Sequence, residues 1–277
     1  MNSPQTPSFE TVRLLADGPV ARLSFNRPDN ANAFDRRMWE ELPRALEWIG
    51  TQRHLRVVVL SGEGRHFTGG IDLSVVSWLM ELTADPQRAT RGREDVLAFI
   101  EKAQHAFNAL ERCPVPVIAA IHGACVGAGV DLIAACDLRL CSADAKFCVK
   151  EVDLAVVPDV GTLQRLSHVI GYSATAELTY SAETFDARRA LDLRLVSRVL
   201  DNKGALLESA NRLAQDIASK PPTAVRGIKR NLLWSRDHSV QDGLAFVATW
   251  NAAMLVGEDL AEAVEAAKQK RKAIFPD

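Results

Sequence analysis

The sequence predicts an α/β protein with a parallel sheet in its core and a helical region at its C-terminal end. Two observations predict this fold class. Strand-like and helix-like segments alternate from Val20 to Val199, an order that builds a parallel sheet covered by helices. From Gly204 onward only helical patterns remain. We therefore expect a core formed by residues 1–200 and a helical C-terminal region formed by residues 201–277.

The expected strands are short. Some are continuous apolar runs, which are typical of strands buried on both faces of a parallel sheet, and others alternate between apolar and polar residues. In chain order they are Val20–Phe25, Arg56–Ser61, Pro116–Ile121, Asp137–Cys141 and Lys146–Lys150. Residues Val75–Arg93 are polar and irregular, so we expect a helix end and a mobile connection there.

The expected helices carry apolar residues at intervals of three and four positions. Pro43 lies inside the first of them and is expected to kink it. In chain order they are Phe34–Ile49, Glu94–Leu110, Asp131–Cys136, Leu206–Ser219, Ala224–Leu233, Val240–Leu255 and Glu258–Ala273, with a further helix beginning near Thr162. The last four form the C-terminal region, which we expect to pack on the core.

The composition is that of an ordinary globular protein of 277 residues, 47% of them hydrophobic, with a formal net charge of −2. This balance lacks the positive surplus typical of nucleic-acid binding. No apolar run approaches the roughly 18 residues of a membrane span. Residues Met1–Phe9 lack a secretory signal, and the chain does not end in the peroxisomal signal Ser-Lys-Leu, so we expect a cytoplasmic protein.

Cysteines and histidines show no metal-binding pattern. The five cysteines include no C-x-x-C pair, and we expect them to be small buried residues. The six histidines show no H-x-x-x-H or H-E-x-x-H spacing, so we expect no metal. His66 and His122 lie in two glycine-bearing loops, which they either orient or support structurally.

These two loops, residues 62–73 and 122–132, each follow a buried strand and enter a helix. Neither matches a phosphate loop or a dinucleotide fingerprint. Such a geometry leaves amide N–H groups unpaired at a helix N-terminus, where they attract negative charge. Two such amides converging on one point would form an oxyanion hole. The alternative is that the glycines only allow the strands to turn sharply.

Three acids follow the second loop. Asp131 lies in an apolar run, Glu151 ends a strand-like segment, and Asp159 stands eight residues later among apolar neighbours. Apolar surroundings raise carboxyl pKa values toward the range in which proton transfer is efficient at neutral pH. Each acid also has a structural alternative: Asp131 at the positive end of its helix, Asp159 as the N-cap of the helix near Thr162, and Glu151 as a solvated strand end.

Four segments together resemble the enoyl-CoA hydratase/isomerase (crotonase) superfamily and, within it, the Δ3,5-Δ2,4-dienoyl-CoA isomerases. They are Arg65–Leu73, Ala119–Leu132, Lys150–Asp153 and Asp159–Leu166, and the resemblance extends from about Val20 to Phe275. It implies a spiral of β-β-α turns whose C-terminal helices assemble a homotrimer or homohexamer. It also implies an acyl-CoA thioester substrate, no cofactor, and a role in fatty acid β-oxidation.

The resemblance also implies roles for individual residues. The amides of Ile71 and Ala128 would hold the thioester oxygen. Glu151 would exchange the proton at C2, Asp159 the proton at C6, and Asp131 would assist them by tuning its neighbours or holding water. Substrate contacts would come from the first loop, at Gly69, Gly70, Asp72 and Leu73.

The subfamily assignment depends on Asp131 and Asp159, because typical hydratases carry a glutamate and a glycine at these positions. Two departures from the family pattern, Ala128 in place of a common glycine and Pro158 before Asp159, could alter acyl preference. Two alternatives stay open. One is a hydratase or another isomerase that uses Glu151 with Asp131, and the other is a non-catalytic acyl-CoA-binding protein.

Overall fold

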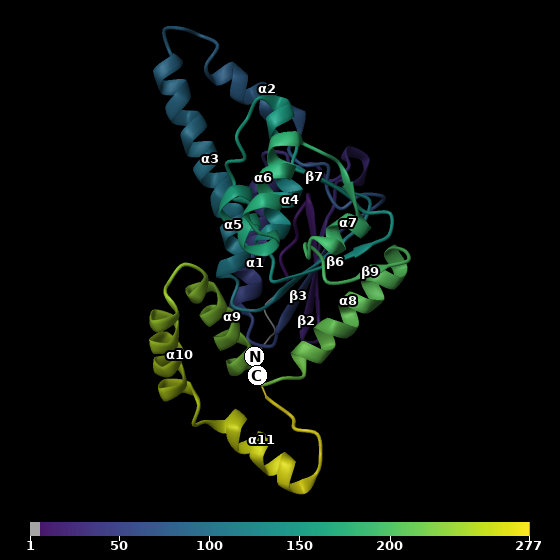
Figure 1. Ribbon diagram of the computed structural model, residues 1–277, viewed down its shortest axis with the longest axis vertical. Helices are drawn as coiled ribbons and strands as arrows, with labels where there is room; N and C mark the ends of the chain where they lie inside the picture. The colour runs from purple at the N-terminus through teal and green to yellow at the C-terminus, as the bar shows by residue number, and fades with distance from the viewer. Residues whose placement is uncertain (1–5, 277) are drawn as a thin grey trace.

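The computed structural model describes residues 6–276, and its centre is a six-stranded sheet in the order β1-β2-β3-β4-β6-β9 (Figure 1). All neighbours pair in parallel except β1 and β2, which are antiparallel. A second sheet, in the order β5-β7-β8, has three short strands. The bounds are β1 Val12–Asp17, β2 Val20–Phe25, β3 Val57–Gly62, β4 Val117–Ile121, β5 Ala124–Val126, β6 Leu138–Ser142, β7 Lys146–Cys148, β8 Phe185–Asp186 and β9 Val199–Leu200.

Helices cover both faces of the large sheet and continue beyond it. Their bounds are α1 Met38–Thr51, α2 Leu73–Leu82, α3 Ala89–Arg112, α4 Ala128–Ala134, α5 Thr162–Ile170, α6 Tyr172–Ser181, α7 Ala187–Asp192, α8 Lys203–Ala218, α9 Pro222–Arg236, α10 Val240–Met254 and α11 Glu258–Gln269, with short 3-10 turns η1 Pro28–Asn30 and η2 Glu151–Leu154. The chain repeats one unit, a strand in the large sheet, a strand in the small sheet and then a helix, as in β4-β5-α4. The predicted α/β fold with β-β-α turns and C-terminal helices is confirmed.

The apolar strands are continuous runs because both faces of the large sheet are buried. Val57 and Val59 of β3 face α8, whose alanines on one side pack against them. Val58 and Leu60 point the other way, into the main core. That main core contains α1, α3 and α4. Alternate residues of a strand point to opposite faces, so a strand covered on both sides needs apolar residues throughout.

Tertiary contacts changed three expectations from the sequence. Residues 75–93 are mostly helical, with α2 running to Leu82 and α3 beginning at Ala89, and Trp78 packs edge-on against Phe99 at a ring distance of 5.4 Å. The first helix begins at Met38 rather than at Phe34, because Phe34 donates its amide to the Gly70 carbonyl. The helix continues through Pro43. Strands β1, β5, β8 and β9 were not among the expected strands.

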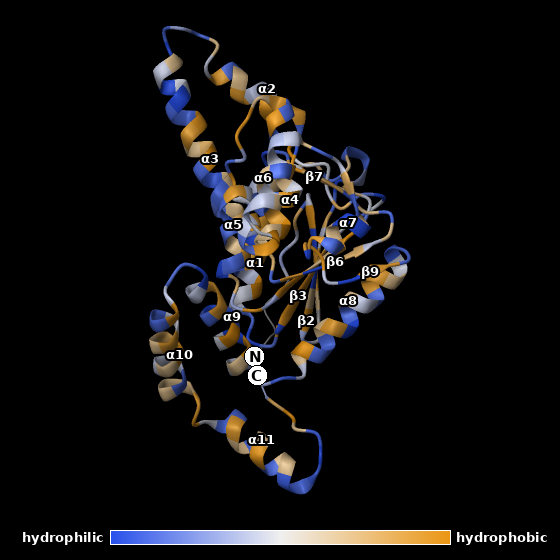
Figure 2. Cartoon of the chain, in the orientation of Figure 1, coloured by the Kyte–Doolittle hydropathy of each residue, from blue (hydrophilic) through white to orange (hydrophobic). Residues whose placement is uncertain are grey.

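Helix α9 packs on the body of the molecule, where the buried Lys229 donates to the Leu110 and Val115 carbonyls, whereas α10 and α11 extend away from it (Figure 1). Helices α10 and α11 contribute one buried residue each, Gly243 and Ala266. Several large apolar side chains on them are exposed, and Figure 2 shows hydrophobic residues along this arm. None of the helices within residues 6–276 is both long and apolar enough to cross a membrane.

Candidate active site

The two glycine loops lie side by side at the carboxyl ends of β3 and β4. They are joined by a parallel bridge between Thr68 and Cys125, in which Thr68 donates to the Ala124 carbonyl over 3.0 Å and accepts from the Val126 amide over 3.2 Å. The first loop is therefore held like a strand against the second. Carboxyl ends of parallel strands are the usual place for ligand sites in α/β proteins.

The Ile71 amide follows Gly70, the residue of the first loop that lies against the second loop. Ile71 pairs with Phe34, and this bridge uses the Gly70 carbonyl and the Asp72 amide, at 2.7 and 3.0 Å. In a parallel bridge of this kind the central residue's own N–H points to the opposite side. Within residues 6–276 no hydrogen-bond acceptor pairs with this N–H.

The Ala128 amide is the first of α4, and it too has no acceptor in the described part of the chain. The loops are so close that a Cβ built on Gly70 would lie 3.7 Å from the Ala128 nitrogen and 2.6 Å from the Val126 carbonyl oxygen. Gly70 has φ +93°, a conformation that other residues rarely adopt. The predicted amide pair is thus placed at the contact between the loops, where it can bind a developing oxyanion.

Glu151 lies beside the second loop, in the turn η2 rather than in a strand, since β7 ends at Cys148. A Cβ built on Gly127 would stand 3.3 Å from Glu151 Oε1. Glu151 Oε2 is buried with no hydrogen-bond partner within residues 6–276. Burial raises the pKa of Glu151, and the nearby charge of Asp159 raises it further. A carboxylate so placed can take a proton from a carbon next to a bound carbonyl.

Asp131 is fully buried, and its role in the fold is now clear. Its Oδ1 accepts the Thr162 amide over 2.6 Å, so it caps α5 from another element. The alternative in which Asp159 caps this helix is wrong. Burial first, and the charge of Glu151 second, raise the pKa of Asp131 to about 8. Burial of the two carboxyls side by side therefore disfavours the form of the Asp131–Glu151 pair in which both are ionised.

The raised pKa of Asp131 predicts a stability effect. Because the folded state binds this proton more tightly than the unfolded state, the free energy of unfolding decreases as pH rises from the ordinary pKa of 3.8 to about 8. Asp131→Asn keeps the oxygen that accepts the Thr162 amide but stays neutral. We expect it to raise Tm at pH 8 by about 3 °C or more and to change Tm less at pH 5.

Thermal unfolding of both proteins at the two pH values checks this expectation. The exposed Asp153, whose carboxylate pairs with Lys150, supplies the control variant Asp153→Asn. An equal shift of Tm at pH 5 and pH 8 for Asp131→Asn would contradict a buried titrating group.

Asp159 is half-buried, and burial raises the pKa of its carboxyl. Its main-chain carbonyl accepts from Gln104 Nε2 over 2.7 Å. The structure thus brings all three predicted acids into one neighbourhood. Sequence reasoning missed Gln104, Asn108 and Glu111, although their spacing places these polar residues on one face of α3.

The predicted substrate-binding residues of the first loop already have partners inside the protein. The Gly69 amide donates to the Ala31 carbonyl, and the Gly70 amide donates to Thr68 Oγ1 over 3.1 Å. The Asp72 carboxylate caps α2 through the Ser74 amide and pairs with Arg27 over 2.9 Å, an ion pair that sequence reasoning missed. Leu73 is 69% exposed. These contacts hold the backbone on either side of Ile71.

The two loop histidines orient the loops. His66 Nδ1 accepts from the Ala124 amide over 3.1 Å, and His122 Nε2 lies 3.3 Å from the Gly64 carbonyl oxygen. Lys203 Nζ donates to the carbonyls of Gly62 and Gly64. Burial and the neighbouring Lys203 lower the pKa of His122 to about 4, so its ring stays neutral. Within residues 6–276 no group of three or more metal-ligating side chains is assembled.

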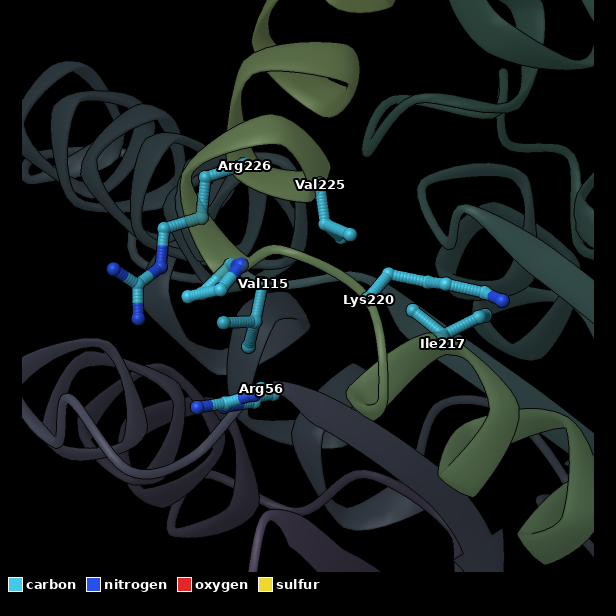
Figure 3. Close-up of a pocket in the computed structure, with 7 residues that line it drawn as sticks. Arg56, Val115, Ile217, Lys220, Val225 and Arg226 are labelled. Atoms are coloured by element: carbon cyan, nitrogen blue, oxygen red, sulfur yellow. The ribbon is translucent and has the colours of Figure 1, made fainter. Parts of the chain in front are cut away.

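A shallow hollow lies at the amino ends of β3 and β4, opposite the two loops, and is lined by Arg56, Lys220 and Arg226, among others (Figure 3). Arg56 donates to the carbonyls of Ala218 and Phe275 over 3.1 and 2.6 Å. This arginine therefore serves the packing of the C-terminal segment, and the hollow is remote from the two loops.

The chain belongs to the enoyl-CoA hydratase/isomerase family, whose sequence model matches residues 16–277. The peroxisomal Δ(3,5)-Δ(2,4)-dienoyl-CoA isomerase of Arabidopsis thaliana is 46% identical over 268 residues, covering 97% of this chain and 96% of that protein. The mitochondrial Δ(3,5)-Δ(2,4)-dienoyl-CoA isomerase of Mus musculus is 47% identical over 267 residues, covering 95% and 81%. The crystal structure of enoyl-CoA hydratase from Bacillus anthracis matches with a TM-score of 0.86 and 30% identity, covering 96% and 98%.

Proposed function

We propose that this protein converts a 3,5-dienoyl-CoA into its 2,4-isomer, as the names of its relatives from Arabidopsis and mouse imply. One observation carries the assignment. Asp159 lies near enough to Glu151 for its charge to raise the pKa of Glu151, and Glu151 lies beside the second loop, whose Ala128 amide has no acceptor within residues 6–276. A hydratase reaction needs acids at neighbouring carbons, whereas moving two conjugated double bonds needs a second acid farther along the acyl chain.

The proposed reaction is a pair of proton transfers. Glu151 takes a proton from C2, and the electrons of the broken C–H bond move into the conjugated system, with negative charge on the thioester oxygen. The Ile71 and Ala128 amides stabilise that oxyanion. Asp159 then gives a proton to C6, which leaves the double bonds at C2 and C4. No atom other than a proton is exchanged, and solvent resets both carboxyl groups.

This sequence of steps requires Glu151 ionised and Asp159 protonated. Burial raises the pKa of Asp159 in the required direction, and ionisation of Asp131 beside Glu151 is disfavoured because it would place two buried negative charges together. Activity should therefore fall at low pH, as Glu151 gains a proton, and at high pH, as Asp159 loses one.

An ultraviolet assay of the purified protein with a 3,5-dienoyl-CoA tests the proposal, because the conjugated 2,4-dienoyl thioester absorbs differently. We expect turnover that far exceeds water addition to a 2-enoyl-CoA. The opposite ratio would support the alternative hydratase, and thioester binding with no turnover of either substrate would support a non-catalytic acyl-CoA-binding protein.

The proposed reaction uses no metal and no cofactor. Protein dialysed against a chelator should retain its isomerase activity within about twofold, because no interaction in the proposed reaction is lost. Restoration of a lost activity by added metal would contradict this part of the proposal.

The proposed assembly is a homotrimer or homohexamer formed through the C-terminal helices. In support, α9 and α10 border an open groove of about 570 Å³ whose walls include the exposed apolar residues Ile228, Leu232 and Leu244. Contiguous exposed apolar surface of this kind marks interaction sites. Sedimentation should give a mass of three or six chains of 30.3 kDa, and a monomer would contradict the proposal.

The cytoplasmic location predicted from the sequence also stays a proposal, since the relatives above are described as peroxisomal and mitochondrial. Cell fractionation with an antibody against the protein distinguishes these compartments.

A further inference from the structure

The backbone around Asp159 is held by side chains from three other places in the fold. Gln104 Nε2 donates to the Asp159 carbonyl over 2.7 Å. Arg165 Nη1 donates to the Val160 carbonyl over 3.3 Å, and Asp131 accepts the Thr162 amide. Within residues 6–276 no side-chain hydrogen bond holds the Asp159 carboxyl itself, so its position depends on the main chain.

The segment that leads to Asp159 needs such support. Residues 152–157 are all exposed, and Val157 is exposed to 70%. A segment with few buried contacts is held weakly by packing. The acid would therefore be poorly placed without anchors on its C-terminal side.

One face of α3 supplies the first of these anchors, Gln104, and holds the second, Arg165. Gln104, Asn108 and Glu111 are four and three positions apart, a spacing that aligns side chains on one helix face. Glu111 binds Arg165 in a bidentate pair with both distances at 3.0 Å, and Asn108 Oδ1 accepts from the same guanidinium. Arg236 of α9 also pairs with Glu111, over 2.5 Å. Bidentate charged pairs of this kind fix geometry strongly.

The backbone at Gly161 leaves space for the Arg165 guanidinium. Its φ is +132°, and a Cβ at this position would lie 2.0 Å from Arg165 Nη1. The guanidinium thus occupies the space that a side chain would need. The Asp159–Thr162 backbone and the α3 face fit each other, and Gln104 is the member of that face that contacts Asp159 directly.

We propose that Gln104 is a positioning residue for Asp159. By holding the Asp159 main chain, Gln104 sets the distance of the Asp159 carboxyl from the acyl chain, and it does not act on Glu151. The inference rests on the proposed isomerase function. Gln104 contacts neither Glu151 nor the two glycine loops through any hydrogen bond in the described part of the chain. Its loss should slow the proton transfer at C6 and spare the transfer at C2.

The test uses Gln104→Met, which keeps the length of the side chain and removes the donor. The isomerisation of a 3,5-dienoyl-CoA is followed in D2O, with deuterium measured at C2 of recovered substrate and at C6 of product. We expect kcat to fall on the order of ten- to a hundredfold with KM changed less than about threefold, as misplacement of a reacting group implies. The ratio of C2-deuterated substrate to product should rise.

Glu101→Gln is the matched control, because Glu101 is exposed on the same helix, three residues away. It should leave kcat and the deuterium ratio unchanged. An unchanged ratio in Gln104→Met, whether kcat falls or not, would overturn the inference, since a merely structural role would slow both proton transfers together.

A second measurement does not depend on activity. Hydrogen exchange of the full-length protein should show faster deuterium uptake in residues 158–164 of Gln104→Met than of wild type, and equal uptake elsewhere in the site. If the wild type fails to isomerise the dienoyl-CoA while Gln104→Met still takes up deuterium faster in residues 158–164, that pair of results would reject the proposed function but support the positioning role. Equal uptake throughout would overturn the inference.

Discussion

Asp159→Asn is expected to lower kcat for isomerisation of a 3,5-dienoyl-CoA by on the order of 10²- to 10⁴-fold, the range typical of a lost general acid. Asparagine has the same shape, and its main-chain carbonyl can still accept from Gln104. It has no proton to give to C6 at neutral pH. Affinity for a saturated acyl-CoA should stay within about threefold, because the oxyanion amides are unaffected.

The same variant should still exchange the C2 proton of the substrate with D2O, since Glu151 is intact. Asp153→Asn is the control, because Asp153 is an exposed acid of the same neighbourhood. Full isomerase activity in Asp159→Asn would remove this residue from the mechanism.

Gly70→Ala is expected to lower kcat by on the order of 10²- to 10³-fold, the cost of losing one donor of an oxyanion hole. The new Cβ would lie 2.6 Å from the Val126 carbonyl oxygen, at a residue with φ +93°. The first loop must therefore move away from the second, and the Ile71 amide moves with it. Both proton transfers should slow, because both pass through the same oxyanion.

Exchange at C2 thus separates the two variants: Gly70→Ala should lose it and Asp159→Asn should keep it. Gly257→Ala is the control, since a Cβ there meets nothing within 4 Å and φ is in the extended region. The folded state of each variant is checked by circular dichroism. Persistent C2 exchange in folded Gly70→Ala would mean that the loop contact does not form the oxyanion hole.

The candidate site residues could be proposed from the sequence because each belongs to a local pattern. The two loops were found from glycines after buried strands, and Asp131, Glu151 and Asp159 from acids among apolar neighbours. The structure brings them together as expected. The residues that hold them in place could not be predicted in the same way, because Arg27 and Gln104 act on partners 45 and 55 positions away.

Local patterns failed where a distant contact was stronger. Phe34 fits the helical spacing of the residues after it, yet it pairs with Ile71 and helix α1 begins at Met38. The helix near Thr162 shows the same effect, because the nearby Asp159 is a plausible cap by sequence and Asp131, 31 positions earlier, provides the cap. Capping and bridge hydrogen bonds depend on which groups meet in space, whatever their distance along the chain.

The sequence by itself determined the fold class, the order of the central strands and the two loops, and which acids are candidates for the site, because periodicity and residue chemistry are properties of neighbours in the chain. Only the tertiary structure decided that Asp131 is a buried cap with a raised carboxyl pKa and that the main chain of Asp159 is held from α3. Burial and the proximity of other charges set a carboxyl pKa, and both arise only when remote segments pack together.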